Sequence, residues 1–356
     1  MRIVILGLTI TSSWGNGHAT TYRGLMQGLV RRGHDVLFLE REQPWYADNR
    51  DLPEPPYGQT AVYDGLDALY AWGDRIAAAH LVIVGSFVPD GAAIGAWVQG
   101  RAAACAFYDI DTPITLSALA AGTCAYLTPG LLRGYGLYLS FTGGPTLHYL
   151  ERTLGAQAAR ALYCSADPAI YRPDPDAAPV WDLGYLGTYS PDRQPVLERL
   201  LCDPARAWPA GQFAVAGPQY PDDVAWPPNV ARTMHLSPAE HRAFYAGQRY
   251  TLNVTRADMV RRGYSPSVRL FEAACCGVPV ISDAWPGLDA FFRPGSEIIV
   301  AETAADVLTT LRTMPEKARR AIGAAARARV LAAHTGDHRA AELEAYAAEL
   351  RARVPA

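Results

Sequence analysis

Two sets of short apolar segments, each alternating with helical stretches, constrain the fold of this chain more than any other feature. In the first half, the segments that predict strands are Ile3–Ile10, Asp35–Leu39, Leu81–Val84, Ala103–Tyr108, Leu137–Phe141 and Ala161–Cys164. Because nearly every position in them is apolar, rather than every second one, they fit a sheet that is covered on both faces. Strands that alternate with helices, such as the amphipathic stretch Thr20–Arg32, predict a parallel α/β layer.

A second α/β set follows a segment rich in proline and aspartate, Asp167–Asp182, which is typical of an interdomain linker. Its strands are expected at Leu183–Leu186, Phe213–Val215, Tyr250–Val254, Val278–Ser282 and Ile298–Val300. We therefore predict a first domain at residues 1–166, a linker at 167–182, a second domain at 183–335 and a final helix in 336–356 that packs back on the first domain. Two such domains would enclose a cleft at the strand ends, where ligands bind in sheets of this kind.

Composition excludes several classes of function. A net charge of −3 and the lack of a basic stripe argue against a nucleic-acid partner. Six cysteines without a CxxC pair indicate reduced thiols rather than a disulfide framework or a zinc site. The single lysine, Lys317, disfavours chemistry that needs a lysine base, so arginines, main-chain N–H groups and helix N-termini must bind anions. We find no signal peptide and no integral membrane segment, and we predict a cytoplasmic location.

The loop at residues 15–18, GNGH, follows the first strand and precedes the first helix, and three interpretations of it are open. Its glycines partly match a dinucleotide fingerprint, with Glu40 placed to bind a ribose, but Thr20 replaces the third glycine and the loop starts late. Glycine and asparagine also suit a purely structural turn. In the third interpretation, His18 stands at the carboxyl end of the strand as a base for a hydroxyl group.

A carboxylate beside His18 would fix its tautomer, and two candidates follow a buried strand at the same edge of the sheet. They are Asp109 and Asp111, and the sequence leaves open which of them points inward. We predict His18, Asp109 and Asp111 as the catalytic group. Two carboxylates after a strand also resemble a metal-binding pair, but they serve more often as caps or acceptor contacts, so we predict no metal site and no cofactor.

The stretch from Asn253 to Asp289 carries a second constellation. A strand ends near Val254 and leaves Arg256 in a loop, and Ser265 is a candidate N-cap for the following helix, with Pro266 at its first position. The free N–H groups near Ser267 and Val268 would form an anion site. One turn later Glu272 could bind the two hydroxyls of a ribose, or it could be a solvated helix residue paired with Arg269.

The segment SVRLFEAACCGVPVISD resembles the signature of the C-terminal, donor-binding domain of GT-B glycosyltransferases. With SSWGNGHATTYRGL, RRGHDVLFLER and GYSPSVRLFEAACCGVPVISD, the chain is similar to the CgeB-type, spore-maturation branch of that superfamily over most of its length. The resemblance implies an α/β, GT-B fold: two Rossmann-like domains with a central cleft. It also implies that Glu272 binds the donor ribose and that the helix start at 265–268 binds the diphosphate.

The same resemblance assigns further residues. Residues 187–189, which follow the first strand of the second domain, would approach the phosphates. Main-chain groups of residues 235–237 would contact the nucleobase. Gly17 and His18 would face the sugar and the acceptor. The donor-binding residues predicted in this way are Gly15, Gly17, Gly187, Thr188, Tyr189, Leu236, Arg256, Tyr264, Ser265, Ser267, Val268, Arg269 and Glu272.

The chain also departs from the pattern of the family. Many retaining members carry a second glutamate eight residues before the first, and Tyr264 stands there in this chain. They also carry an arginine and a lysine after the first strand of the second domain, for which Arg193, Arg256, Arg262 and Arg269 are the available substitutes. A His18 and aspartate pair resembles the dyad of inverting members, whereas CgeB-type proteins are grouped nearer the retaining ones, so the stereochemistry stays open with a lean to retention.

We therefore predict metal-independent transfer of a hexosyl group from a nucleotide-diphosphate sugar to the hydroxyl of a small-molecule or glycan acceptor. The nucleotide sugar would be a co-substrate. The alternatives are a nucleotide-sugar epimerase of the same fold, a non-catalytic nucleotide-binding protein and, less favoured, an NAD-linked oxidoreductase.

Overall fold

In the computed structural model, which describes residues 1–353, the chain divides into two compact units. The first unit contains Met1–Cys164 and the C-terminal segment from Gly336, and the second contains Ser165–Thr335. The last three residues of the C-terminal segment predicted at 336–356 lie outside the described residues.

The first unit is built on a seven-stranded sheet in the order β3-β2-β1-β4-β5-β6-β7, and all of its strand pairs are parallel. The strands are β1 (Arg2–Gly7), β2 (Asp35–Arg41), β3 (Gln59–Tyr63), β4 (Leu81–Gly85), β5 (Cys105–Asp109), β6 (Leu137–Ser140) and β7 (Ala159–Ala161). Every residue of β4, β5 and β6 is buried, which is the pattern of a sheet covered on both faces.

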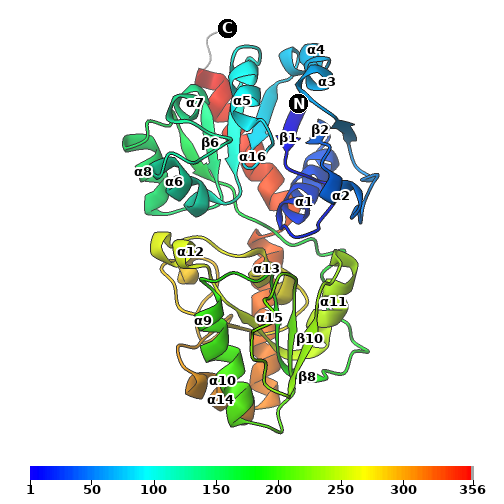
Figure 1. The fold of residues 1–356 in the computed structure, drawn as a ribbon, viewed down its shortest axis with the longest axis vertical. Helices are drawn as coiled ribbons and strands as arrows, with labels where there is room; N and C mark the ends of the chain where they lie inside the picture. Colours follow the sequence, from blue (N-terminus) through cyan, green and yellow to red (C-terminus); the bar gives the residue numbers. More distant parts are fainter. Residues whose placement is uncertain (354–356) are drawn as a thin grey trace. The chain divides into compact units, whose positions relative to one another are not determined.

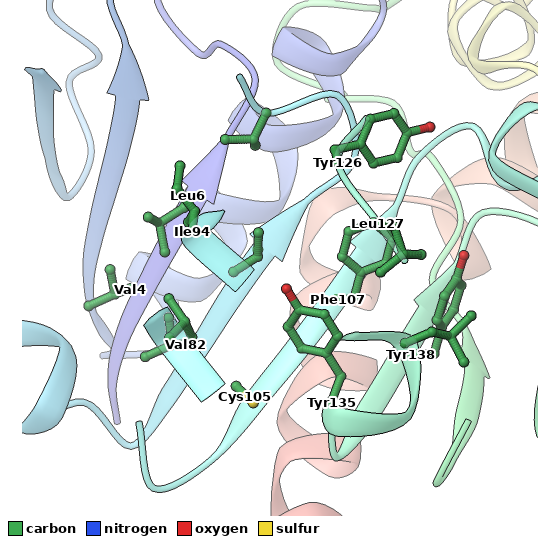
Figure 2. Close-up of a cluster of buried hydrophobic side chains, with 14 of the residues drawn as sticks. Val4, Leu6, Val82, Ile94, Cys105, Phe107, Tyr126, Leu127, Tyr135 and Tyr138 are labelled. Atoms are coloured by element: carbon green, nitrogen blue, oxygen red, sulfur yellow. The ribbon is translucent and has the colours of Figure 1, made fainter. Parts of the chain in front are cut away.

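Helices connect these strands (Figure 1). They are α1 (His18–Arg31), α2 (Pro44–Ala47), α3 (Leu66–Tyr70), α4 (Gly73–Ala77), α5 (Gly91–Gln99), α6 (Thr112–Ala120), α7 (Pro129–Gly134), α8 (Pro145–Arg152) and α16 (Gly336–Arg353). Figure 2 shows part of the hydrophobic core of this unit, with Val4, Leu6 and Val82 toward one side of the view and the rings of Phe107, Tyr126, Tyr135 and Tyr138 toward the other. These aromatic rings fill the space beside the strands that carry the candidate site.

The C-terminal helix α16 packs against α1, as the red and blue helices of Figure 1 show. Glycines permit the close approach, since a Cβ atom on Gly28 would lie 2.5 Å from the carbonyl oxygen of Gly336. Glu344 of α16 also pairs with Arg32 and His34 directly after α1. The C-terminal segment is therefore an integral part of the first unit.

The second unit contains a six-stranded parallel sheet in the order β10-β9-β8-β11-β12-β13. The strands are β8 (Trp181–Leu186), β9 (Phe213–Ala216), β10 (Val230–Thr233), β11 (Gln248–Asn253), β12 (Val280–Ser282) and β13 (Ile299–Val300). The helical segments are α9 (Gln194–Leu197), the π-helical turn η1 (Glu198–Cys202), α10 (Asp203–Ala207), α11 (Pro238–Ala246), α12 (Ala257–Arg262), α13 (Val268–Cys275), the 3-10 turn η2 (Leu288–Ala290), α14 (Ala304–Thr313) and α15 (Glu316–Ala333).

The structure differs from the sequence-based expectations at several elements. β3 and β10 were not predicted, and β7 ends at Ala161, where the predicted strand Ala161–Cys164 begins. The final helix expected in 336–356 is present as α16, and His334 and Thr335 separate it from α15. The predicted linker lies within the second unit, and its last two residues already belong to β8.

Candidate active site

The loop between β1 and α1 is held by a buried carboxylate from β2. Glu40, which is 0% exposed, accepts hydrogen bonds from the main-chain N–H groups of Ile10 at 2.7 Å and Thr11 at 3.0 Å. It also accepts one from the Thr11 hydroxyl at 2.7 Å. The carboxylate therefore shapes the loop and has no access to a ribose. The interpretation of this loop as a dinucleotide site with Glu40 as its acid is wrong.

Asn16 caps the helix that follows the loop. Its side-chain oxygen accepts hydrogen bonds from the N–H groups of His18 at 3.0 Å and Ala19 at 3.2 Å, which are the first two of α1. A Cβ atom on Gly15 or Gly17 would meet no other atom within 4 Å, although Gly15 has a φ of +68°. The loop thus ends at the start of α1, where Asn16 caps the helix and His18 is its first residue.

His18 and Asp111 meet across the carboxyl edge of the first sheet. The Nε2 atom of His18 lies 3.1 Å from a carboxylate oxygen of Asp111, the residue that precedes α6. His18 is 5% exposed, and its Nδ1 atom has no hydrogen-bond partner among the described residues. In a neutral ring whose Nε2–H donates to Asp111, Nδ1 keeps a lone pair that can accept a proton.

Asp109 points away from this pair. Its carboxylate is 0% exposed and accepts hydrogen bonds from the hydroxyls of Thr115 at 2.6 Å and Tyr138 at 2.5 Å. Burial raises the pKa of Asp109 to about 6 although both hydroxyls lower it, and the neighbouring Asp111 raises it further. Of the three predicted catalytic residues, the structure brings His18 and Asp111 together and places Asp109 in the supporting core.

Phe87 is a residue at this site that the sequence did not single out. It lies just after β4 with a φ of +61°, a strained value for a residue with a side chain. Its ring stands edge-on to that of His18, with 5.7 Å between the ring centroids, and its centroid lies 4.7 Å from that of the Tyr126 ring. The residue as a whole is 36% exposed. An aromatic surface therefore lies directly beside the His18 imidazole.

In the second unit, Glu272 lies one turn into α13 and is only 3% exposed. The Tyr245 hydroxyl donates a hydrogen bond to its Oε2 atom at 3.0 Å, and Nδ1 of His241 lies 3.9 Å from the same oxygen. The alternative of a solvated Glu272 paired with Arg269 is therefore wrong. The hydroxyl of Tyr171 also interacts with this buried carboxylate.

The start of α13 also differs from the prediction. The N-cap is Ser267 rather than Ser265, which is fully buried two residues earlier, and Val268 is the first helical residue. The Ser267 hydroxyl donates to the side chain of Asn253 at 2.7 Å and makes no capping hydrogen bond. The first N–H groups of α13, which helix geometry leaves unpaired, are therefore not capped by this side chain.

Arg269 is bound to the protein itself. Its Nη1 atom donates to the side-chain oxygen of Asn253 at 3.0 Å, its Nε atom donates to the carbonyl of Leu186, and its guanidinium lies over the Tyr185 ring. A Cβ atom on Gly187 would lie 2.6 Å from Nη2 of the same arginine. Arg269 therefore supports the turn after β8, at which the phosphate-binding residues are predicted.

The other predicted donor residues lie on loops of the second unit. Arg193 donates to the carbonyl of Thr188 at 2.5 Å, and Nε of the partly exposed Arg256 lies 3.9 Å from Asp192 on the same loop. Both arginines thus contact the segment that follows β8.

Three more predicted donor residues are fixed by their own contacts. The N–H of Tyr189 donates to Pro218 at 3.0 Å, the carbonyl of Leu236 lies 3.3 Å from Nε2 of His241, and the N–H of Tyr264 donates to Pro286 at 2.7 Å. Tyr264 has a φ of +49°, so the chain is strained directly before α13.

Comparison with solved structures finds the same fold over the whole chain. Sucrose-phosphate synthase from Thermosynechococcus elongatus is 15% identical, with 99% of this chain and 100% of that chain covered and a TM-score of 0.71. HepE of Anabaena, solved with UDP-glucose, is 13% identical, with 98% and 100% covered and a TM-score of 0.71. An α-glucosyltransferase, AGT, solved with UDP, is 11% identical, with 98% and 100% covered and a TM-score of 0.70.

At these identities the likeness establishes the fold, which is that of GT-B glycosyltransferases. Residues 193–345 match the family model described as glycosyl transferase-like. The matched segment covers most of the second unit and the start of α16. A comparison with curated protein sequences gave no match.

Within residues 1–353, no helix has the length and apolar character needed to span a membrane.

Proposed function

We propose that the protein transfers a hexosyl group from a UDP-sugar to an acceptor hydroxyl and belongs to the CgeB-type branch of the GT-B glycosyltransferases. The observation that carries the proposal is the buried carboxylate of Glu272, which lies one turn inside α13. The N-cap residue of this helix, Ser267, makes no side-chain hydrogen bond to the first N–H groups. This arrangement can hold a ribose and a diphosphate together. The solved complexes of HepE with UDP-glucose and of AGT with UDP support uridine as the nucleoside.

In the proposed donor site, Glu272 accepts hydrogen bonds from the ribose hydroxyls and the N–H groups at the start of α13 bind the diphosphate. The positive end of the helix dipole and the nearby Arg256 and Arg193 would offset the charge that develops on the leaving UDP. This charge compensation needs no divalent ion, so we propose a metal-independent reaction.

In the proposed acceptor site, Nδ1 of His18 accepts the proton of the acceptor hydroxyl while its oxygen attacks the anomeric carbon. The bond from that carbon to the diphosphate oxygen breaks, and its electron pair leaves with UDP. Asp111 would hold the His18 ring and stabilise the imidazolium that forms. Phe87 would pack against the acceptor, since its exposed ring lies beside His18.

The hydrogen bond between His18 and Asp111, together with Tyr264 in place of a second glutamate, supports attack from the face opposite the leaving group. We therefore propose inversion at the anomeric carbon, although the family resemblance leans to retention. The anomeric proton coupling of the transferred sugar, measured by NMR, tests this directly. A product with the configuration of the donor would contradict the role of His18 as the base and leave the donor site unaffected.

The experiment that tests the proposed function is a turnover assay with radiolabelled UDP-glucose and a panel of sugar and aryl-glycoside acceptors, in buffer with EDTA. Release of UDP together with a glycosylated product is expected. Wild-type protein that neither binds UDP nor transfers from any UDP-hexose would contradict the proposal.

A further inference from the structure

His241 lies between the two parts of the second unit that are predicted to bind the nucleoside. On one side its Nε2 atom is 3.3 Å from the carbonyl oxygen of Leu236, in the segment expected to read the base. On the other side its Nδ1 atom is 3.9 Å from Oε2 of Glu272, which is expected to bind the ribose.

The side chains around His241 keep this arrangement in place. The hydroxyl of Tyr171 lies 3.3 Å from Nδ1 of His241, and the hydroxyl of Tyr245, one turn along α11, donates to Glu272 at 3.0 Å. Both tyrosines are at most 1% exposed. The histidine is therefore enclosed by groups that can donate to or accept from each of its ring nitrogens.

The segment that carries Leu236 is anchored to the same helix. Ser237 forms a capping box at the start of α11, in which Glu240 accepts hydrogen bonds from the Ser237 N–H at 2.8 Å and from its hydroxyl at 2.7 Å. The bond to His241 adds a second attachment one residue earlier in the chain. Together they fix the direction in which the Leu236 carbonyl points.

The proton of the imidazole can be placed by elimination among these partners. A carbonyl oxygen only accepts, so the contact with Leu236 requires a proton on Nε2. In the neutral ring Nδ1 is then an acceptor that faces the Tyr171 hydroxyl, and this hydroxyl also interacts with the Glu272 carboxylate. Tyr245 donates to Oε2 of Glu272, so both tyrosines help to hold this carboxylate beside His241.

A carbonyl held in this way can discriminate between pyrimidines. It has a second lone pair, which can accept the N3–H of uracil, whereas N3 of cytosine carries no proton and would meet the carbonyl with its own lone pair. A carbonyl that is free to turn away would lose this distinction. The direction of the Leu236 carbonyl therefore decides between uridine and cytidine nucleotides.

We propose that His241 is a positioning residue for donor selection: its Nε2–H fixes the Leu236 carbonyl so that the site takes a uridine rather than a cytidine diphosphate sugar. This inference rests on the proposed function, because it assumes that the nucleoside lies between Leu236 and Glu272. His241 acts through the carbonyl and need not touch the substrate.

The test is titration calorimetry of the full-length protein with UDP and with CDP, for the wild type and three variants. His241→Gln places an amide N–H near the position of Nε2 and can restore the bond to Leu236, whereas His241→Asn places it near that of Nδ1 and cannot. Tyr245→Phe removes the hydrogen bond to Glu272 and leaves the contact with Leu236 intact. Thermal unfolding of each variant checks that it is folded.

We expect the wild type to prefer UDP over CDP, and His241→Gln to keep most of this preference. In His241→Asn the preference should fall by about tenfold, the effect of one lost hydrogen bond. Tyr245→Phe should weaken UDP and CDP to the same degree. Equal preference in the two His241 variants would overturn the inference. A wild type that binds neither nucleotide would instead contradict the proposed function itself, and the inference with it.

Discussion

The starts of α1 and α13 look alike in the sequence and differ in the structure. Both follow loops rich in glycine, serine or asparagine at the carboxyl edge of a parallel sheet. At α1 the Asn16 side chain accepts hydrogen bonds from the first two N–H groups, so the helix start is closed by its own loop. At α13 the Ser267 hydroxyl turns to Asn253 and makes no cap.

Two helix starts with similar sequences can therefore have different tasks. An uncapped helix N-terminus can bind an anion with its free N–H groups and its dipole, and a capped one cannot use the same groups. We therefore assign binding of the diphosphate to α13 and presentation of His18 to α1. The following predictions test that division.

Replacement of His18 should give the largest effect. In His18→Gln the ring that accepts the proton is lost, and turnover with UDP-glucose should fall by about 10²-fold or more. Binding of UDP should change little, because the residue belongs to the capped helix start. Measurement of kcat and of the Kd for UDP in parallel separates the two, and a variant that loses UDP binding as well as turnover would break the division.

Asp109 gives the first unit a pH-dependent stability. Its pKa of about 6 in the folded protein lies above the ordinary value of 3.8, so the folded state binds the proton more tightly. The contribution to the free energy of unfolding is complete below pH 4 and is lost as the pH rises through 6. A difference of about two pKa units corresponds to about 3 kcal/mol.

Asp109→Asn cannot ionise, so we expect its stability to fall less than that of the wild type between pH 4 and pH 8. Thermal unfolding across this range measures the two curves. If they run parallel, the carboxyl is not held in its neutral form by burial.

Glu272→Gln should weaken UDP binding by about 1.5–3 kcal/mol, the range for a hydrogen bond to a charged group. The amide preserves the volume of the buried side chain, and kcat at saturating donor should change less than the Kd. Calorimetry with UDP is the measurement. Unchanged affinity would remove Glu272 from the ribose site.

Ser267→Asp should close the start of α13 in the way that Asn16 closes α1. A carboxylate at this N-cap can accept from the first N–H groups and repels a diphosphate, so we expect UDP affinity to fall by about tenfold while the helix keeps or gains stability. Ser267→Ala is the matched control and should bind UDP nearly as the wild type does. Equal UDP affinity in Ser267→Asp and the wild type would show that the diphosphate is bound elsewhere.

Asn16→Ala is the converse change and should have the smallest effect. Loss of the cap should lower the free energy of unfolding by about 1 kcal/mol, and UDP affinity should not change. Chemical denaturation and calorimetry measure the two quantities. A marked loss of UDP binding would mean that the α1 start also holds the donor.

The fold could be predicted well because it follows from long patterns. Apolar strands that alternate with helices predicted both parallel sheets, and the family resemblance named the architecture. β3 and β10 escaped notice because they are short strands at the sheet edges, where partial exposure removes the apolar pattern. Edge strands gain their pairing from the neighbouring strand, which a local pattern cannot reveal.

The candidate site could be predicted only in part, because side-chain direction depends on tertiary contacts. Asp109 and Asp111 are two residues apart, and only the folded loop shows that Asp111 reaches His18 while Asp109 is buried against Thr115 and Tyr138. Phe87 and His241 lie in no recognisable motif. Their positions follow from a strained backbone and from contacts between segments far apart in the sequence.

Binding of the diphosphate at α13 is tested by calorimetric titration of UDP into the full-length protein, once in EDTA and once with Mg²⁺. We expect saturable binding of one UDP per chain with the same affinity in both buffers, because α13 and the nearby arginines bind the diphosphate. Absence of binding in both buffers, or binding only with Mg²⁺, would contradict it.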